Sequence, residues 1–241
     1  MEVVKLISME FIFVATTRDA TKNMRHAQSV RMGCLLGAKE NTVRSWAAQI
    51  TILGSAAIRA TFDNKTGMTL RQDLQRITDT LPVTQHPLLI QELSLIAGHG
   101  IKIIESQYPI ESYTCVVHSF GLVQDPTYLS VAGFGLGRTF AGADFINFLL
   151  SHELLRERPK GTFLAGDLVI YFQDDSFRHI GTTLKEDRVL SKWGTGYLYD
   201  HPVWEVPSNY GESVRYFEQI SSNEGLELFV LFAKSRGFIF S

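Results

Sequence analysis

The spacing of apolar residues predicts that the first part of the chain is mainly helical. Helical periodicity is found over residues 41–58, 69–80, 87–97 and 141–158. Thr69 is a good N-cap for the second of these helices, and Pro87 suits the first turn of the third, which Gly98 follows. A further helix is predicted to begin near Tyr113, after a loop that contains Pro109.

Beyond Gly161 the pattern changes to short β-type runs that are separated by turn-forming residues. These runs are residues 168–172, 179–184, 188–193, 202–206 and 214–220. Consecutive strands with short turns predict an antiparallel sheet. The chain is therefore expected to have an α+β fold, with N-terminal helices packed on a C-terminal antiparallel β-sheet. Residues 101–104 predict a further short strand, and residues 224–234 predict a closing helix or strand.

The two patterns suggest a division of the chain into two parts. Residues 1–85 are interpreted as a mostly helical N-terminal extension that carries no chemical motif, and residues 86–241 as the main domain. The chain has 241 residues, of which 45% are hydrophobic and 20% charged, so it can bury a sizeable core.

Charge and cysteine content narrow the classes of partner and compartment. The net charge of −2 gives no broad attraction to nucleic acid or to an anionic membrane, so neither is an expected partner. The two cysteines, Cys34 and Cys115, are too few for a disulfide scaffold and suit a reducing compartment. The apolar start is interrupted by Glu2, Lys5 and Glu10, unlike a signal peptide. A cytoplasmic protein is expected, with export by a non-classical route left open.

Cys115 and His179 form the most informative candidate site. Cys115 falls near the predicted helix start, where free N–H groups and the helix dipole stabilise a thiolate. His179 opens a β-run after a polar turn, and the 64 residues between the two allow a helix and a sheet to bring them together. Such a pair activates a thiol for acyl transfer. The alternative is a buried, inert cysteine and a packing histidine.

Three short motifs occur in the order of a known family. They are Tyr113-Thr114-Cys115, the run Gly166-Asp167-Leu168-Val169 and His179-Ile180-Gly181. Residues 108–217 thereby resemble the NlpC-type branch of the papain-like cysteine peptidases and amidases, as a bacterial offshoot of that group. The resemblance implies a papain-like fold, with the nucleophile on a helix, the base on the sheet, and a peptide or amide as substrate.

The match to the family pattern is incomplete around the reacting groups. Val116 and Val117 follow the cysteine, where the family commonly has a small residue and then glycine. The third group, which orients the imidazole, should come from the strand after the histidine. Ser191 is the positional match, and His201 is the next candidate. Tyr113 is interpreted either as a hydroxyl donor that lines the cleft or as a packing aromatic.

These residues predict a cysteine hydrolase that uses neither a cofactor nor a metal. Cys115 would attack a carbonyl carbon, and His179 would take the thiol proton and return it to the leaving amine. Backbone N–H groups at the helix start, including that of Cys115, would stabilise the oxyanion. Cys115 and His118 have the spacing of half a zinc site, but no further ligands are evident, so His118 is expected to pack.

Two other functions use the same residues. One is a catalytically inactive papain-like fold that acts as a binding or interaction module. The other is an acyltransferase that passes the acyl group to a lipid or an amine. The sequence does not separate these alternatives, and it leaves the oligomeric state open.

Overall fold

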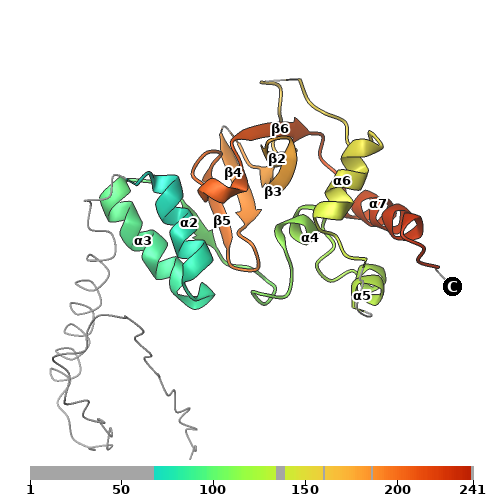
Figure 1. Cartoon of the computed structure of the whole chain (residues 1–241), viewed down its shortest axis with the longest axis horizontal. Helices are drawn as coiled ribbons and strands as arrows, with labels where there is room; N and C mark the ends of the chain where they lie inside the picture. Colours follow the sequence, from blue (N-terminus) through green and yellow to red (C-terminus); the bar gives the residue numbers. More distant parts are fainter. Residues whose placement is uncertain (1–67, 134–138, 160, 186, 240–241) are drawn as a thin grey trace, which may run out of the picture. The chain divides into compact units, whose positions relative to one another are not determined.

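The computed structural model describes residues 68–133, 139–159, 161–185 and 187–239 (Figure 1). All of them belong to one compact unit, which begins at Leu53. Cys34 and the helix predicted over residues 41–58 lie outside the described residues, as does most of the proposed extension of residues 1–85. Within the described part of the chain, no helix is long and apolar enough to cross a membrane.

A six-stranded antiparallel sheet forms the centre of this unit and confirms the predicted α+β class. The strand order is β1-β5-β4-β3-β2-β6. The strands are β1 (Lys102–Ile104), β2 (Leu168–Gln173), β3 (Ser176–Thr183), β4 (Arg188–Lys192), β5 (Leu198–Pro202) and β6 (Ser213–Phe217). β1 precedes most of the helices in the sequence, yet it forms the edge of the sheet beside β5.

The described chain also contains six α-helices and two 3-10 turns. They are α2 (Leu70–Thr80), α3 (His86–Ala97), α4 (Cys115–Ser119), α5 (Pro126–Ala132), α6 (Ala143–Ser151) and α7 (Ser222–Ser235), with 3-10 turns η1 (Val83–Gln85) and η2 (Ser208–Tyr210). Thr69 and Gln72 form a capping box at the start of α2, which is why its beginning is predictable. The closing segment is a helix, α7, and Ser221 caps it by accepting a bond from the Glu224 N–H.

Two predicted elements depart furthest from the observed bounds. The helix predicted over residues 141–158 ends at Ser151, because Glu153 adopts a left-handed conformation (φ 54°) that a helix cannot continue through. The strand predicted over residues 202–206 is β5, which ends at Pro202. Tyr197 and the residues after it pair with β4 at once after the turn at Gly194, so the strand begins earlier than expected.

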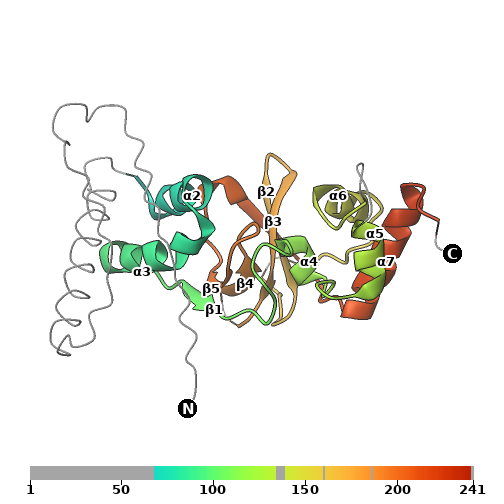
Figure 2. The same cartoon turned by 90° about the horizontal axis from the view of Figure 1, so that it is seen from below.

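Helices pack against both faces of the sheet, and the alternation of side chains along β2 divides the core between them (Figure 2). Leu168, Ile170 and Phe172 face one cluster, which also contains buried residues of α4, α5, α6 and α7. Val169 and Tyr171 face the other, which contains the apolar sides of α2 and α3. Because α2 shares this second cluster, residues before position 85 contribute to the same core as the sheet.

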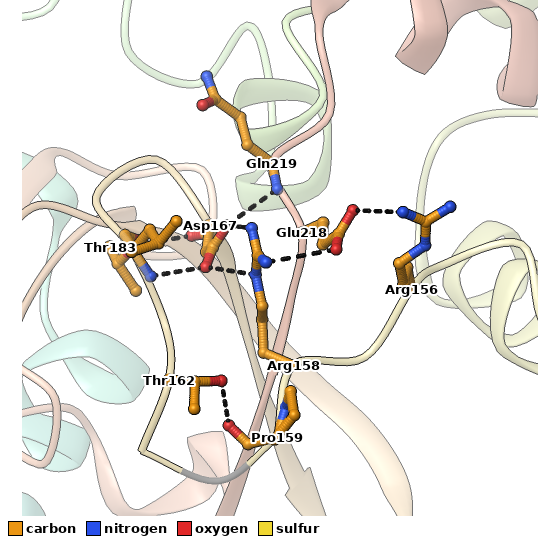
Figure 3. Close-up of polar contacts among 9 residues, drawn as sticks. Arg156, Arg158, Pro159, Thr162, Asp167, Thr183, Glu218 and Gln219 are labelled. Carbon is orange, nitrogen blue, oxygen red and sulfur yellow. Dashed lines mark hydrogen bonds and ion pairs between the residues drawn. The ribbon is translucent and has the colours of Figure 1, made fainter.

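A buried carboxylate fastens the segment that leads into β2 (Figure 3). Asp167 is 1% exposed and accepts hydrogen bonds from Arg158 Nε (3.1 Å) and Nη2 (3.3 Å). It also accepts bonds from the N–H groups of Leu164 (2.7 Å) and Gln219 (3.1 Å). Arg158 forms a second ion pair with Glu218 at 3.3 Å. The Gly-Asp pair of the sequence motif therefore has a structural use, in which the aspartate joins the loop to the chain leaving β6.

Candidate functional site

Cys115 is the first residue of α4 and follows Thr114, whose extended backbone (φ −104°, ψ 176°) marks the helix boundary. The short helix α4 packs against β3 and β4. β3 pairs with β4 at Thr182 and Thr183, which leaves the edge of β3 at Ile180 available to the start of α4. The fold thus brings the cysteine to the sheet, and the residue remains partly exposed.

The surroundings of Cys115 keep its thiol protonated at neutral pH. Desolvation is the largest influence and raises the pKa of the thiol to about 11. The backbone N–H groups of Ile180, Val116 and Cys115 itself oppose this by favouring the thiolate, as does the positive charge of Lys192. The resting site therefore contains a thiol, with donors already placed for a negative charge on the sulfur.

His179 lies on β3 opposite Tyr171 of β2, and its ring stacks on Tyr210 at a centroid distance of 4.0 Å. Nε2 is buried without a hydrogen-bond partner. Burial lowers the pKa of the imidazole well below its usual value, and His201 lowers it further. The His179 ring is therefore neutral at physiological pH.

The structure brings Cys115 and His179 near each other without bonding them. Among the described residues, no hydrogen bond joins the thiol to the imidazole, since Nε2 of His179 has no partner. However, one of the backbone N–H groups that reach the sulfur belongs to Ile180, the residue next to His179. The sulfur thus lies beside the backbone of β3, one residue from His179. The His179 side chain itself lies opposite Tyr171, on the face of the sheet that α2 and α3 cover.

The two candidates for the third position bond to each other. Ser191 Oγ lies 2.8 Å from His201 Nε2, and His201 Nδ1 lies 2.8 Å from the carbonyl oxygen of Pro202. The carbonyl can only accept, so Nδ1 carries the proton and Nε2 accepts from the serine hydroxyl. Burial lowers the pKa of His201 to about 4, which keeps this ring neutral. The Ser191 hydroxyl proton is therefore directed to His201 instead of His179.

Tyr113 has its hydroxyl group already engaged. The oxygen lies 2.6 Å from Ser106 Oγ, and the ring is 4% exposed. Tyr108 packs edge-on against it at 5.9 Å, and His118 stacks on it at 6.0 Å. In this arrangement Tyr113 packs beneath the start of α4. His118 shares that packing, and in the described part of the chain no three His, Cys, Asp or Glu residues gather as metal ligands.

Two residues beyond the predicted candidates contact the site. Lys192, which was read as part of a β-run, is 1% exposed, and its Nζ is 4.2 Å from the centre of the Tyr113 ring. Burial lowers the pKa of Lys192 to about 8, against the opposing influence of Cys115 and Glu111. Tyr210 lies outside every predicted helix and strand, yet its ring stacks on that of His179. The available sequence signal for Lys192 was a lysine next to Trp193 within the β-run predicted over residues 188–193.

Comparisons of the chain with protein-family models, curated proteins and solved structures found no match. The resemblance to the NlpC-type branch therefore rests on the sequence motifs alone. The chemistry of the site depends on the geometry of its own residues.

Proposed function

We propose that the chain is a cysteine hydrolase of papain-like fold, which cleaves an amide or peptide bond through an acyl-thioester on Cys115. The observation that carries the proposal is the position of the thiol. It lies at the N-terminus of α4 and against the Ile180 N–H group, one residue from His179. A cysteine at a helix start that packs on an antiparallel sheet, followed in sequence by a histidine on that sheet, supports the papain-like interpretation.

The reaction begins with a proton transfer between two neutral groups. The imidazole of His179 turns from its stack on Tyr210 toward the sulfur and accepts the thiol proton as Cys115 attacks the carbonyl carbon. The N–H groups of Cys115 and Val116 donate to the developing oxyanion. His179 then protonates the leaving amine, and water hydrolyses the thioester to release the acid and restore the thiol.

A binding module that keeps this fold is the second candidate. One observation favours it: in the resting structure the thiol has a pKa of about 11 and the His179 ring is stacked on Tyr210 without a bond to the sulfur. In that case Cys115 would be a partly buried structural thiol, and any peptide or amide would bind without covalent chemistry.

Acylation by p-nitrophenyl acetate distinguishes the two functions. In a Cys34→Ser background Cys115 is the single cysteine, because the chain has two. A hydrolase releases p-nitrophenol in a burst equal to the enzyme concentration, followed by turnover, with a mass increase on Cys115. Cys115→Ser abolishes the burst, and His179→Ala slows it by about 100-fold or more. His152→Ala, which alters an exposed histidine at the end of α6, should leave it unchanged.

A binding module predicts a different result in the same assay. If acylation is no faster than that of a simple thiol of the same pKa and is unaffected by His179→Ala, the hydrolase proposal is wrong and the binding module remains. Circular dichroism of each variant establishes that a lost burst reflects chemistry and not unfolding.

A further inference from the structure

Lys192 is a buried cation that the sheet directs toward Cys115. Side chains alternate along β4, so Ser191, which bonds His201, lies on the opposite face from Lys192. Lys192 therefore faces α4, the helix that packs on β3 and β4 and begins with Cys115. Its ammonium group lies over the ring of Tyr113, two residues before the cysteine.

The ammonium group of Lys192 is fixed in this place by three contacts. Nζ donates to the carbonyl oxygens of Thr195 (3.1 Å) and Gly196 in the turn after β4. On its other side it contacts the Tyr113 ring at 4.2 Å, within the range of a cation–π interaction. None of these partners is a carboxylate, so the charge of Lys192 is held without a neutralising ion pair in the described contacts.

We propose that Lys192 is a positioning residue of this site, whose ammonium group stabilises the Cys115 thiolate and aligns Tyr113 beneath it. The inference rests on the proposed function, because a thiolate is needed only if Cys115 reacts. Lys192 would act electrostatically through the sulfur and would transfer no proton to the substrate. It would supply the positive charge that the stacked, neutral His179 does not.

Several ionisable groups face this pair and bear on its pH dependence. Glu111 interacts with Lys192 and favours its charged form. His118 stacks on Tyr113, and burial, with a smaller contribution from the charge of Lys192, lowers the pKa of its imidazole. Tyr210 is close enough to Cys115 for a thiolate to raise the pKa of its phenol. Of these groups, Lys192 is the one whose positive charge favours the thiolate.

The test is the rate of Cys115 alkylation by iodoacetamide as a function of pH, in the Cys34→Ser background. Lys192→Met keeps the apolar stem and removes the charge. Loss of one neighbouring charge should raise the thiol pKa by about one unit. The alkylation rate at pH 7, where Lys192 with its pKa of about 8 is still mostly charged, should therefore fall about tenfold. Lys192→Arg should retain most of the rate. Lys185→Met, at an exposed lysine, is the matched control and should change nothing.

A structural role for Lys192 predicts a different result. If the lysine only held the turn after β4, its loss would loosen the site, expose the thiol and make alkylation faster, with a pKa nearer ~8.5. That result, or a profile identical to the parent's, would overturn the inference. If Lys192→Met slows alkylation but p-nitrophenyl acetate gives no burst, the electrostatic pair stands and the hydrolase function falls.

Discussion

Replacing Asp167 with alanine should lower the free energy of unfolding by about 3–4 kcal/mol. The change removes the acceptor of four hydrogen bonds, two from Arg158 and one each from the N–H groups of Leu164 and Gln219 (Figure 3). Breaking a buried ion pair costs about 3–5 kcal/mol. Arg158 keeps its bond to Glu218 and its side chain is 25% exposed, so the loss should fall toward the lower end.

The assay is urea unfolding followed by the fluorescence of the tryptophans, among which Trp193 is 3% exposed and reports on the core. Arg156→Ala is the control, because its pair with Glu218 lies at the surface with the arginine side chain 79% exposed, and its loss should cost less than about 1 kcal/mol. The double variant Asp167→Ala/Arg158→Ala should lose less than the sum of the two single changes. A loss below about 1 kcal/mol for Asp167→Ala would refute the view that this carboxylate secures the segment before β2.

Two further predictions concern the sheet face that carries His201. Its folded pKa of about 4 lies below the unfolded value of about 6.5, so its stabilising contribution is full above pH 6.5 and is lost as the pH falls through about 4. The free energy of unfolding, measured with urea, should fall by about 3 kcal/mol over that range, and by less in His201→Gln. Equal pH profiles for the parent and His201→Gln would contradict this. Gly181→Ala should destabilise by about 1–3 kcal/mol, because the added Cβ would lie 2.6 Å from Val189 Cγ1 and 2.8 Å from the Leu190 carbonyl oxygen. A thermal melt unchanged by Gly181→Ala would show that β4 can move away.

Local signals in the sequence determined the elements that begin with a cap or end at a breaker. Thr69 with Gln72 marks the start of α2, and the left-handed Gly98 marks the end of α3. The loop before Cys115 indicated that a helix begins there, and turn residues separated most of the strands correctly. Each of these signals acts within a few residues, so it can be read without the rest of the fold. The stop at Glu153 was missed because a left-handed glutamate has no sequence signature.

The tertiary structure alone decided which side chains meet at the candidate site. A period of two along a strand tells that Ser191 and Lys192 face opposite ways, but not which of them faces Cys115. That choice depends on which face of the sheet α4 covers and which is covered by α2 and α3. These contacts join residues far apart in the chain, and burial against them sets the charge of His179 and of the Cys115 thiol. Long-range packing and desolvation are properties of the assembled core, so no local pattern can supply them.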